Sequence, residues 1–269
     1  GGDDGISNTA RQILIEKAIG AAQRIYALLP LIQAPDKSKL SGRHGAVAVT
    51  DYRNKGYLPE AIINYLALLG WNPGTEQEIF SLDELVKEFD LSKVQKSGAI
   101  FNIEKLNWFN KKYIEMMDEK IFAKIMKPFL PANVSDVTAM KLAPLLKEKI
   151  SFFAQITELL KGELSFVDAV VPYEKEKLNW KQEKDINVTK THICRIADIL
   201  SEISETEFKK EKIKEKIWPY AEEKGRGNVL WPMRYALSGM EKSPDPFIIA
   251  EILGKEETIK RLTAAYEAI

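Results

Sequence analysis

The sequence has little cysteine: Cys194 is the only one among 269 residues, so no disulfide can form within the chain. Such a composition is typical of a reducing compartment and predicts a cytoplasmic location. No apolar run approaches the roughly 18 to 20 residues that a membrane-spanning helix needs. The opening, Gly1 to Asp4, has neither the basic nor the hydrophobic segment of a secretory signal peptide. The sequence therefore predicts a protein without a membrane partner.

Metal-ligating residues are also scarce. The chain has two histidines and one cysteine, and of these only His192 and Cys194 lie close together in the sequence. A structural zinc site needs about four ligands at suitable spacing, so we expect no structural metal. The motifs of serine hydrolases, Walker phosphate loops and dinucleotide-binding folds are absent from the sequence. None of these reactions is therefore indicated by a motif.

An excess of charge of either sign is missing as well. The 39 basic residues balance 39 acidic residues, whereas nucleic-acid-binding domains often carry a basic excess. A nucleic-acid site in this chain would therefore depend on local segregation of charge. Apolar residues make up 45% of the sequence, which is enough to form a core. The length suits one large domain or two to three small ones.

The first part of the chain has a mixed α/β pattern. Ser7 and Asn8 are good N-cap residues for a helix that Gly20 can close. A short apolar run predicts a buried strand over residues 25–32, followed by a polar loop over 34–45 and an extended segment over 46–49. A lone strand–helix–strand piece cannot form a sheet by itself, so we expect the chain to begin inside a domain.

Helical periodicity dominates the remainder of the sequence. Pro59 suits the first turn of a helix, and Ser81 with Glu84 forms a capping box. We predict further helices over residues 104–125, 138–160, 187–202, 205–217, 230–238, 245–253 and 255–268. Pro144 is expected to kink or divide the helix that contains it. The chain is therefore predicted to be mainly α, with a small α/β part at its start.

Three local features carry positive charge. The Gly-containing loop over residues 39–45 could neutralise phosphate charge in a transition state, or it is an ordinary solvated loop. Lys105, Trp108 and Lys112 share a helix face that could follow an RNA backbone, although a half-buried Trp among solvated lysines has the same pattern. The lysine-rich run over 209–216 reads as a solvated helix face. These features alone do not select a reaction.

Five segments, in order along nearly the whole chain, resemble motifs of one enzyme family. Residues 39–43, Lys-Leu-Ser-Gly-Arg, are similar to the class I signature Lys-Leu-Ser-Lys-Arg. The other four resemblances lie at residues 2–12, at 56–61 with 69–71, at 102–114, and at 230–239 with 243–247 and 253–256. Together they resemble bacterial glutamyl-tRNA synthetases, whose catalytic domain has a Rossmann-type fold. The order and spacing of the segments make this resemblance specific, although each segment alone is weak.

The resemblance implies an architecture and a set of site residues. Residues 1–50 would be the end of the catalytic domain, 51–120 a helical stem-contact fold, and 121–269 an all-helical anticodon-binding domain with two modules that meet near residue 200. The catalytic loop would use Lys39, Ser41 and Arg43, and Asp4, Lys39 and Arg43 would bind ATP with its Mg²⁺. The matched tRNA-binding positions are Lys105, Trp108, Lys149, Arg234, Ser243, Pro244, Pro246 and Phe247, with Lys149 at the third anticodon base.

The physical chemistry of the last segment agrees with these roles. Unstacked bases need flat apolar partners, which Pro244, Pro246 and Phe247 could provide, and Arg234 could pair with a base edge or stack on it. The alternative for residues 244–247 is a helix start capped by Ser243, and both interpretations can hold together.

Two departures from the family pattern limit the expected chemistry. Gly42 stands where the family has its second signature lysine, and the upstream His-x-Gly-His motif does not occur in this sequence. We therefore expect a monomeric tRNA-binding portion of glutamate–tRNA ligase that does not activate glutamate alone, because both halves of the site must clamp ATP. The partner would be glutamate tRNA and possibly glutamine tRNA, with ATP and glutamate as substrates of the full enzyme. The alternatives are a tRNA-binding paralogue without synthetase activity and a helical protein-interaction scaffold.

Overall fold

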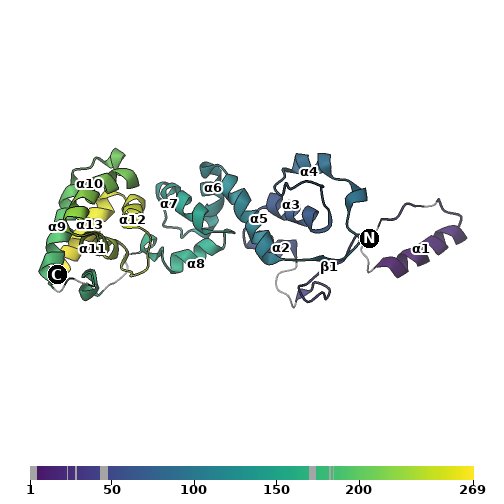
Figure 1. The fold of residues 1–269 in the computed structure, drawn as a ribbon, viewed down its shortest axis with the longest axis horizontal. Coiled ribbons are helices and arrows are strands. Elements are labelled where there is room, and N and C mark those ends of the chain that lie inside the picture. Colours follow the sequence, from purple (N-terminus) through teal and green to yellow (C-terminus); the bar gives the residue numbers. More distant parts are fainter. Residues whose placement is uncertain are drawn as a thin grey trace. The chain divides into compact units, whose positions relative to one another are not determined.

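Helices dominate the computed structural model, which describes residues 5–22, 24–27, 29–42, 48–169, 174–181, 183 and 185–269. The mainly helical fold class is thereby confirmed. The chain forms two compact units, one of residues 1–117 with 150–154 and the other of residues 118–149 with 155–269. The elements of both units are labelled in Figure 1.

The first unit contains five helices and two short strands within the described residues. Its elements are α1 (Ile6–Ala18), β1 (Ile32–Gln33), α2 (Val49–Asn54), α3 (Pro59–Gly70), α4 (Leu82–Glu88), a 3-10 turn η3 (Leu91–Lys93), β2 (Ala99–Ile100) and α5 (Ile103–Met116). The strands pair in parallel, with Ile32 opposite Ala99 and Gln33 opposite Ile100. Helices α3 and α5 pack on each other and carry most of the core.

Aromatic side chains fill this core. Tyr65 packs edge-on against Phe101 with ring centroids 5.4 Å apart, and it lies 5.8 Å from Phe109. The fully buried Asn110 joins two segments, because its Oδ1 accepts from the N–H of Leu58 at 2.8 Å and its Nδ2 donates to the carbonyl of Ser151. A buried amide is tolerated only with such partners. Asn110 thus fixes residues 150–154 to this unit.

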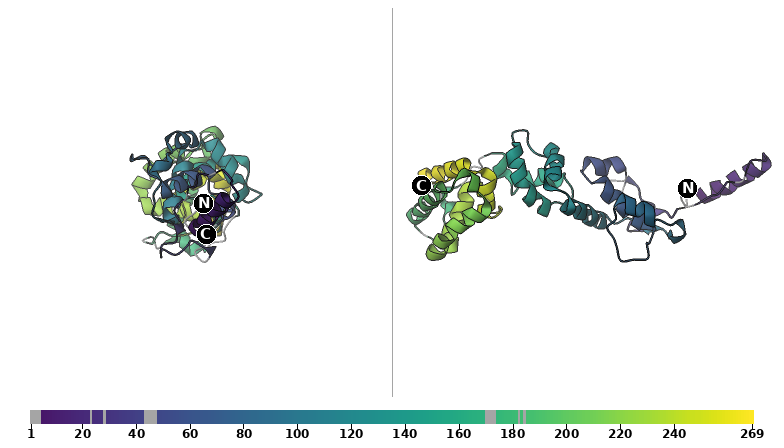
Figure 2. Two further views of the ribbon diagram at one scale, coloured as in Figure 1. Left: turned by 90° about the vertical axis from the view of Figure 1, so that its right-hand side faces the viewer. Right: turned by 90° about the horizontal axis from the view of Figure 1, so that it is seen from above.

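The second unit is built from eight helices in the part that the structure describes. These are α6 (Glu119–Met126), α7 (Asp136–Lys149), α8 (Gln155–Lys161), α9 (Ile186–Ser201), α10 (Lys210–Lys224), α11 (Arg226–Ser238), α12 (Pro246–Leu253) and α13 (Lys255–Ala268). Short 3-10 turns lie between them, η4 (Lys127–Phe129), η5 (Ser165–Val167), η6 (Lys175–Leu178) and η7 (Glu205–Glu207). Helices α9 to α13 form one group, drawn in green and yellow in Figures 1 and 2.

Two cationic side chains from α13 hold this group together. The Lys255 ammonium donates to the carbonyls of Ser201 and Ile203, at 2.8 and 2.7 Å, where α9 ends. A cation suits that position because the last carbonyls of a helix have no partner within it. The Arg261 side chain is only 7% exposed and donates to the carbonyls of Leu237 and Phe166, at 2.8 and 3.1 Å. The matched segment over residues 253–256 therefore contributes directly to the fold.

The start of the chain departs from its predicted pattern. Helix α1 begins at Ile6 after Gly5, rather than after a cap at Ser7 and Asn8. Among the described residues of the run predicted as 25–32, only Ile32 belongs to a strand, β1, because a strand needs a paired neighbour and β2 is two residues long. The extended segment predicted over 46–49 is wrong at Val49, which begins α2, and residues 46–47 lie outside the described part.

Helix predictions further along the chain are confirmed within a few residues, with three changes. The helix predicted over 205–217 lies at Lys210–Lys224, and residues 205–207 form the separate 3-10 turn η7. The run predicted over 104–125 divides at Asp118, whose carboxylate accepts from the N–H groups of Lys120 and Ile121 and so caps α6. Pro144 stays inside α7, and the division falls at residues 150–154 instead. Pro59 at the start of α3 and the Ser81–Glu84 capping box of α4 are confirmed.

Candidate functional site

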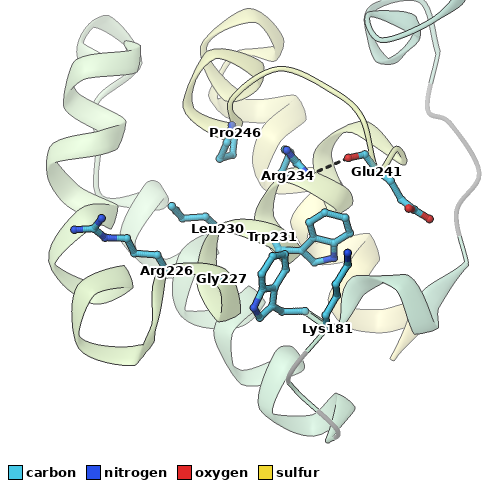
Figure 3. Close-up of a pocket in the computed structure, with 9 residues that line it drawn as sticks. Lys181, Arg226, Gly227, Leu230, Trp231, Arg234, Glu241 and Pro246 are labelled. Carbon is cyan, nitrogen blue, oxygen red and sulfur yellow. Dashed lines mark hydrogen bonds between the residues drawn. The ribbon is translucent and has the colours of Figure 1, made fainter.

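An open pocket of about 600 Å³ lies in the second unit beside α11, shown in close-up in Figure 3. It combines two indoles, three cations, one carboxylate and apolar groups. The lining residues are Trp180, Lys181, Arg226, Gly227, Leu230, Trp231, Arg234, Glu241 and Pro246. Five of them project from α11, and the others come from the segment before α9, the loop after α11 and the start of α12. The pocket is therefore organised by one helix face.

Helical spacing places the aromatic groups of this face in register. Trp231 and Tyr235 are four residues apart on α11, and their rings stack at 6.2 Å with planes 9° apart. The Trp231 ring is half-buried, and its Nε1 donates to the carbonyl of Lys177 at 2.8 Å. The Trp180 ring lies 5.5 Å from the Trp231 ring, with the planes tilted by 54°. Two indoles thus form one wall of the pocket.

Gly227 allows the second indole to approach α11. A Cβ atom on this residue would lie 2.4 Å from Nε1 of Trp180, closer than any real carbon contact. The indole consequently rests on helix backbone that a side chain would cover. The close approach of the indole therefore explains glycine at this position, the second residue of α11.

Arg234 supplies the main hydrogen-bonding group of the pocket. Its Nη2 donates to the carbonyl of Glu241 at 2.9 Å, and Figure 3 shows this bond beside the Trp231 ring. The guanidinium carbon lies 4.8 Å from the centroid of that ring, within the range of a cation–π interaction. A guanidinium over an indole can stack on, or donate hydrogen bonds to, a planar polar ring. The arrangement thus suits an unstacked heterocycle.

Residues predicted around the anticodon divide between this pocket and the core. Pro246 lines the pocket at the first turn of α12. Phe247, in contrast, is 1% exposed and packs edge-on against Trp218, with ring centroids 6.4 Å apart. Pro244 is also buried. These two side chains, like Pro246, expose little surface, whereas the half-buried indoles of Trp180 and Trp231 line the pocket. The tRNA-binding role of Pro244 and Phe247 stays a prediction.

The cap of α12 also differs from its prediction. Asp245, rather than Ser243, is the N-cap, because its carboxylate accepts from the N–H of Phe247 at 2.9 Å. The half-buried Ser243 has its Oγ 3.1 Å from Oγ of Ser238 instead. Ser243 thus secures the end of α11 to the following loop.

Lys149 lies at the end of α7, beside a second pocket of the same unit. Its ammonium pairs with the Glu163 carboxylate at 2.8 Å, and both side chains are partly exposed. Glu163 lines a pocket of about 730 Å³ together with Glu158, Leu159, Lys161, Gly162, Ser165, Lys177, Tyr235, Gly239, Met240, Glu241 and Lys242. Glu241 borders both pockets. A cation and an anion therefore stand together at the wall of the second pocket.

Lys105 and Trp108 meet on α5 in the first unit. The Lys105 ammonium lies 4.2 Å from the centroid of the Trp108 ring and also pairs with Glu78. Trp108 is 37% exposed and packs edge-on against Phe109. Lys112 pairs with Glu115 at 2.9 Å on the same helix. This face combines the two interpretations drawn from the sequence, since the Trp is half-buried and the lysines remain partly exposed.

The loop predicted to bind phosphate begins as a tight turn on β1. Lys39 bridges Gln33 in antiparallel fashion, and the N–H of Leu40 donates to the carbonyl of Ile32 at 3.2 Å. Ser41 is half-buried, and a Cβ on Gly42 would meet nothing within 4 Å. Asp4 and Arg43 lie outside the described residues. The described part of the loop thus has room for a larger side chain at residue 42.

Several residues of the pocket were not predicted as site residues. Trp231 and Leu230 lie one helical turn before Arg234, and Arg226 and Gly227 lie one turn earlier still. That spacing alone would have placed them on one face with Arg234. Trp180 gives no such signal, because it is far from α11 in the sequence and joins the pocket only through tertiary packing.

The described residues show neither a cluster of metal ligands nor a membrane-spanning helix. No group of three or more histidine, cysteine, aspartate or glutamate side chains there is placed to hold a metal ion. In the same part of the chain, no helix is both long enough and apolar enough to cross a membrane.

Comparisons with known proteins agree along the whole chain. Residues 121–266 match the family model of an anticodon binding domain, and residues 2–108 match that of the class I tRNA synthetase catalytic domain (E and Q). The glutamate–tRNA ligase of Nitrosospira multiformis is 38% identical over 99% of this chain and 57% of its own length. That of Heliobacterium modesticaldum is 37% identical over 99% of this chain and 54% of its own length. The chain spans about half the length of these curated relatives.

Solved structures give the same result. The crystal structure of a glutamate tRNA ligase from Elizabethkingia meningosepticum, in complex with its amino acid, aligns with a TM-score of 0.80 and 36% identity. The glutamate–tRNA synthetase of Elizabethkingia anophelis aligns with a TM-score of 0.78 and 35% identity. Each alignment covers 99% of this chain and 56% of the solved chain.

Proposed function

Because the chain belongs to the glutamate–tRNA ligase family, we propose that it is the tRNA-binding portion of such a ligase and that the pocket beside α11 receives anticodon bases. The observation that carries the proposal is the face of α11, where Arg234 lies over Trp231 and next to Trp180. The relatives that match nearly the whole chain are glutamate–tRNA ligases. The two alternatives, a paralogue without synthetase activity and a protein-interaction scaffold, are therefore not favoured.

The chemistry of the pocket suits unpaired bases. Every base has a π-face, and stacking on an aromatic side chain contributes about 1–3 kcal/mol per base. Trp180 and Trp231 would supply this stacking energy for any base. The Arg234 guanidinium would instead distinguish between bases by its hydrogen bonds to a base edge. Lys181 and Arg226, both exposed at the pocket, would attract the phosphate backbone.

The second pocket would receive the third anticodon base at the Lys149–Glu163 pair. The ammonium can only donate hydrogen bonds, and the carboxylate can only accept them. Cytosine and guanine each present both an acceptor and a donor on their pairing edge. Adenine and uracil do so as well, so the pair alone would not distinguish glutamate tRNA from glutamine tRNA. The tRNA partners would then be glutamate tRNA and also glutamine tRNA.

The first unit would contribute to the rest of the ligase reaction. Lys105 and Trp108 would contact the inner corner of the tRNA, through charge and through the exposed edge of the indole. Lys39, Ser41 and Arg43, with Asp4, would belong to the site for ATP and its Mg²⁺ in the complete enzyme, which would join glutamate to tRNA through a glutamyl-adenylate. There the Lys39 cation would offset charge that develops on the triphosphate.

The proposal is tested by RNA affinity. We expect the 269-residue chain to bind glutamate tRNA, and a single anticodon base change to weaken binding by about 1–3 kcal/mol on a salt-dependent background. Fluorescence titration at two salt concentrations, with tRNAs changed at each anticodon base in turn, measures both effects. Equal, weak binding to all of these RNAs would contradict the proposal.

A second expectation concerns chemistry. The sequence has no His-x-Gly-His motif, and both halves of a class I site are needed to hold ATP for attack by glutamate. We therefore expect this polypeptide to show no ATP–pyrophosphate exchange with glutamate above the blank. A full-length relative, assayed beside it, is the positive control. An exchange rate near that of the control would refute the expectation.

A further inference from the structure

Three side chains of α11 are bonded to the backbone of two neighbouring loops. Trp231 Nε1 donates to the carbonyl of Lys177 at 2.8 Å, and Tyr235 is hydrogen-bonded to the backbone of Glu174, both in the segment before α9. On the other side, Arg234 Nη2 donates to the carbonyl of Glu241 at 2.9 Å, in the loop after α11. The orientation of this face consequently depends on where the two loops lie.

One ion pair joins these loops directly. The Lys177 ammonium lies 3.1 Å from the Glu241 carboxylate and 3.2 Å from that of Glu174. Its hydrogen bond to Glu241, followed by that to Glu174, raises the pKa of Lys177. Glu241 borders both pockets, and Lys177 borders the second. The Lys177–Glu241 pair, here called the loop bridge, therefore stands where the two pockets meet.

We infer that Lys177 and Glu241 are positioning residues for base recognition: the loop bridge holds both loops so that Trp231 and Arg234 keep their orientation. The inference rests on the proposed function. If Trp231 stacks on a base and Arg234 donates to a base edge, both side chains need a fixed orientation before the RNA binds, and the loop carbonyls that accept from them provide it. Each residue acts through its backbone carbonyl on one reading side chain and through its side chain on the other loop. Without the loop bridge, the carbonyls of Lys177 and Glu241, which accept from Trp231 and Arg234, are no longer held at a fixed separation.

The bridge is suited to a clean test because it adds little to folding. Both side chains are largely exposed, at 43% and 60%, and exposed ion pairs contribute little to stability. Variants at these positions should therefore remain folded, which thermal unfolding of each protein verifies. A reversed pair, Lys177→Glu with Glu241→Lys, can rebuild the attraction with the charges exchanged.

The experiment compares both single variants with the double variant in the 269-residue chain. The readout is base discrimination, defined as the ratio of affinities for glutamate tRNA and for the same tRNA with the most damaging anticodon change. We expect each single variant to lower this ratio by about threefold to tenfold, and the double variant to restore it to within about twofold. The matched control is Lys212→Glu with Glu215→Lys, an exposed pair on α10 that lines neither pocket and should leave the ratio unchanged.

Base discrimination separates this role from a direct phosphate contact. If Lys177 only attracted phosphate, its loss would weaken binding to both RNAs equally and would reduce the salt dependence by about one contact, with the ratio unchanged. Glu241→Lys would then strengthen binding to both RNAs. Either result, or a double variant as poor as the single ones, would overturn the inference.

A measurement without RNA separates failure of the inference from failure of the proposed function. The indole N–H signal of Trp231 in a proton–nitrogen NMR spectrum, assigned with Trp231→Phe, reports the hydrogen bond to Lys177. We expect the signal to move in both single variants and to return in the double variant. An unmoved signal would refute the positioning role. If the unaltered chain fails to discriminate between RNAs while this signal responds as expected, the proposed function fails and the bridge stands.

Discussion

Replacing Arg234 with alanine is expected to abolish most of the discrimination between anticodon bases, a loss of about 1–3 kcal/mol or about tenfold to a hundredfold. The guanidinium provides directional hydrogen bonds in the pocket, whereas the indoles of Trp180 and Trp231 stack on any base. Arg234→Lys should not restore the ratio, because an ammonium has no planar fork and stacks poorly on Trp231. Affinities for glutamate tRNA and its anticodon variants measure the effect.

Arg226→Ala is the matched control for this prediction. Arg226 lines the same pocket with the same charge, but its guanidinium pairs with Glu222 at 2.9 Å and lies 4.7 Å from the Trp218 ring. Figure 3 shows it away from Arg234 and Glu241. Its loss should weaken binding to all RNAs by a similar factor and leave the ratio intact. If both variants reduced the ratio equally, Arg234 would have no special part in reading.

Replacing Arg261 with methionine is expected to destabilise the second unit by about 3–5 kcal/mol. The Arg261 side chain is 7% exposed, pairs with Glu257 at 2.8 Å and donates to the carbonyls of Leu237 and Phe166. Methionine fills a similar volume, yet it leaves two backbone carbonyls without their donor and Glu257 with only the exposed Lys260 as its partner. Urea unfolding followed by circular dichroism measures the loss, with the transition of each unit fitted separately.

Lys260→Met is the control that separates the effect of losing a buried cation from the effect of losing a positive charge beside Glu257. Lys260 pairs with the same Glu257 at 3.3 Å, but its side chain is 72% exposed. Its removal should change stability by less than about 1 kcal/mol, as for most exposed ion pairs. Equal losses of stability in both variants would mean that either cation beside Glu257 contributes the same amount. The two hydrogen bonds from Arg261 to backbone carbonyls would then contribute nothing.

Most helices could be predicted from the sequence because the signals that start and pattern a helix lie within a few neighbouring residues. Pro59 starts α3, Ser81 and Glu84 cap α4, and apolar spacing sets the helices after residue 186. The first part of the chain was harder, since a strand depends on a partner that the local pattern does not reveal. The run over 25–32 has the composition of a buried strand, yet among its described residues only Ile32 lies in a strand, β1.

The candidate site was predictable only in part, for a similar reason. Arg234 and Pro246 were selected by motif, and the structure brings both to one pocket. The same motif contained Phe247, whose burial depends on how α12 packs against α10, and sequence spacing within one helix carries no such information. Trp180 was missed entirely, because its contact with Gly227 joins residues distant in the chain.

The contact between Trp180 and Gly227 also has an evolutionary consequence. Because a Cβ at residue 227 would overlap the indole, these two positions cannot vary independently. Any chain of this fold with alanine or a larger residue at 227 should have a smaller side chain at 180, or a displaced segment before α9. Glycine at 227 can then be lost only if the indole is lost or the segment that carries it moves, so the two positions are expected to change together. A relative that has lost the indole would have to obtain its second stacking surface from another element.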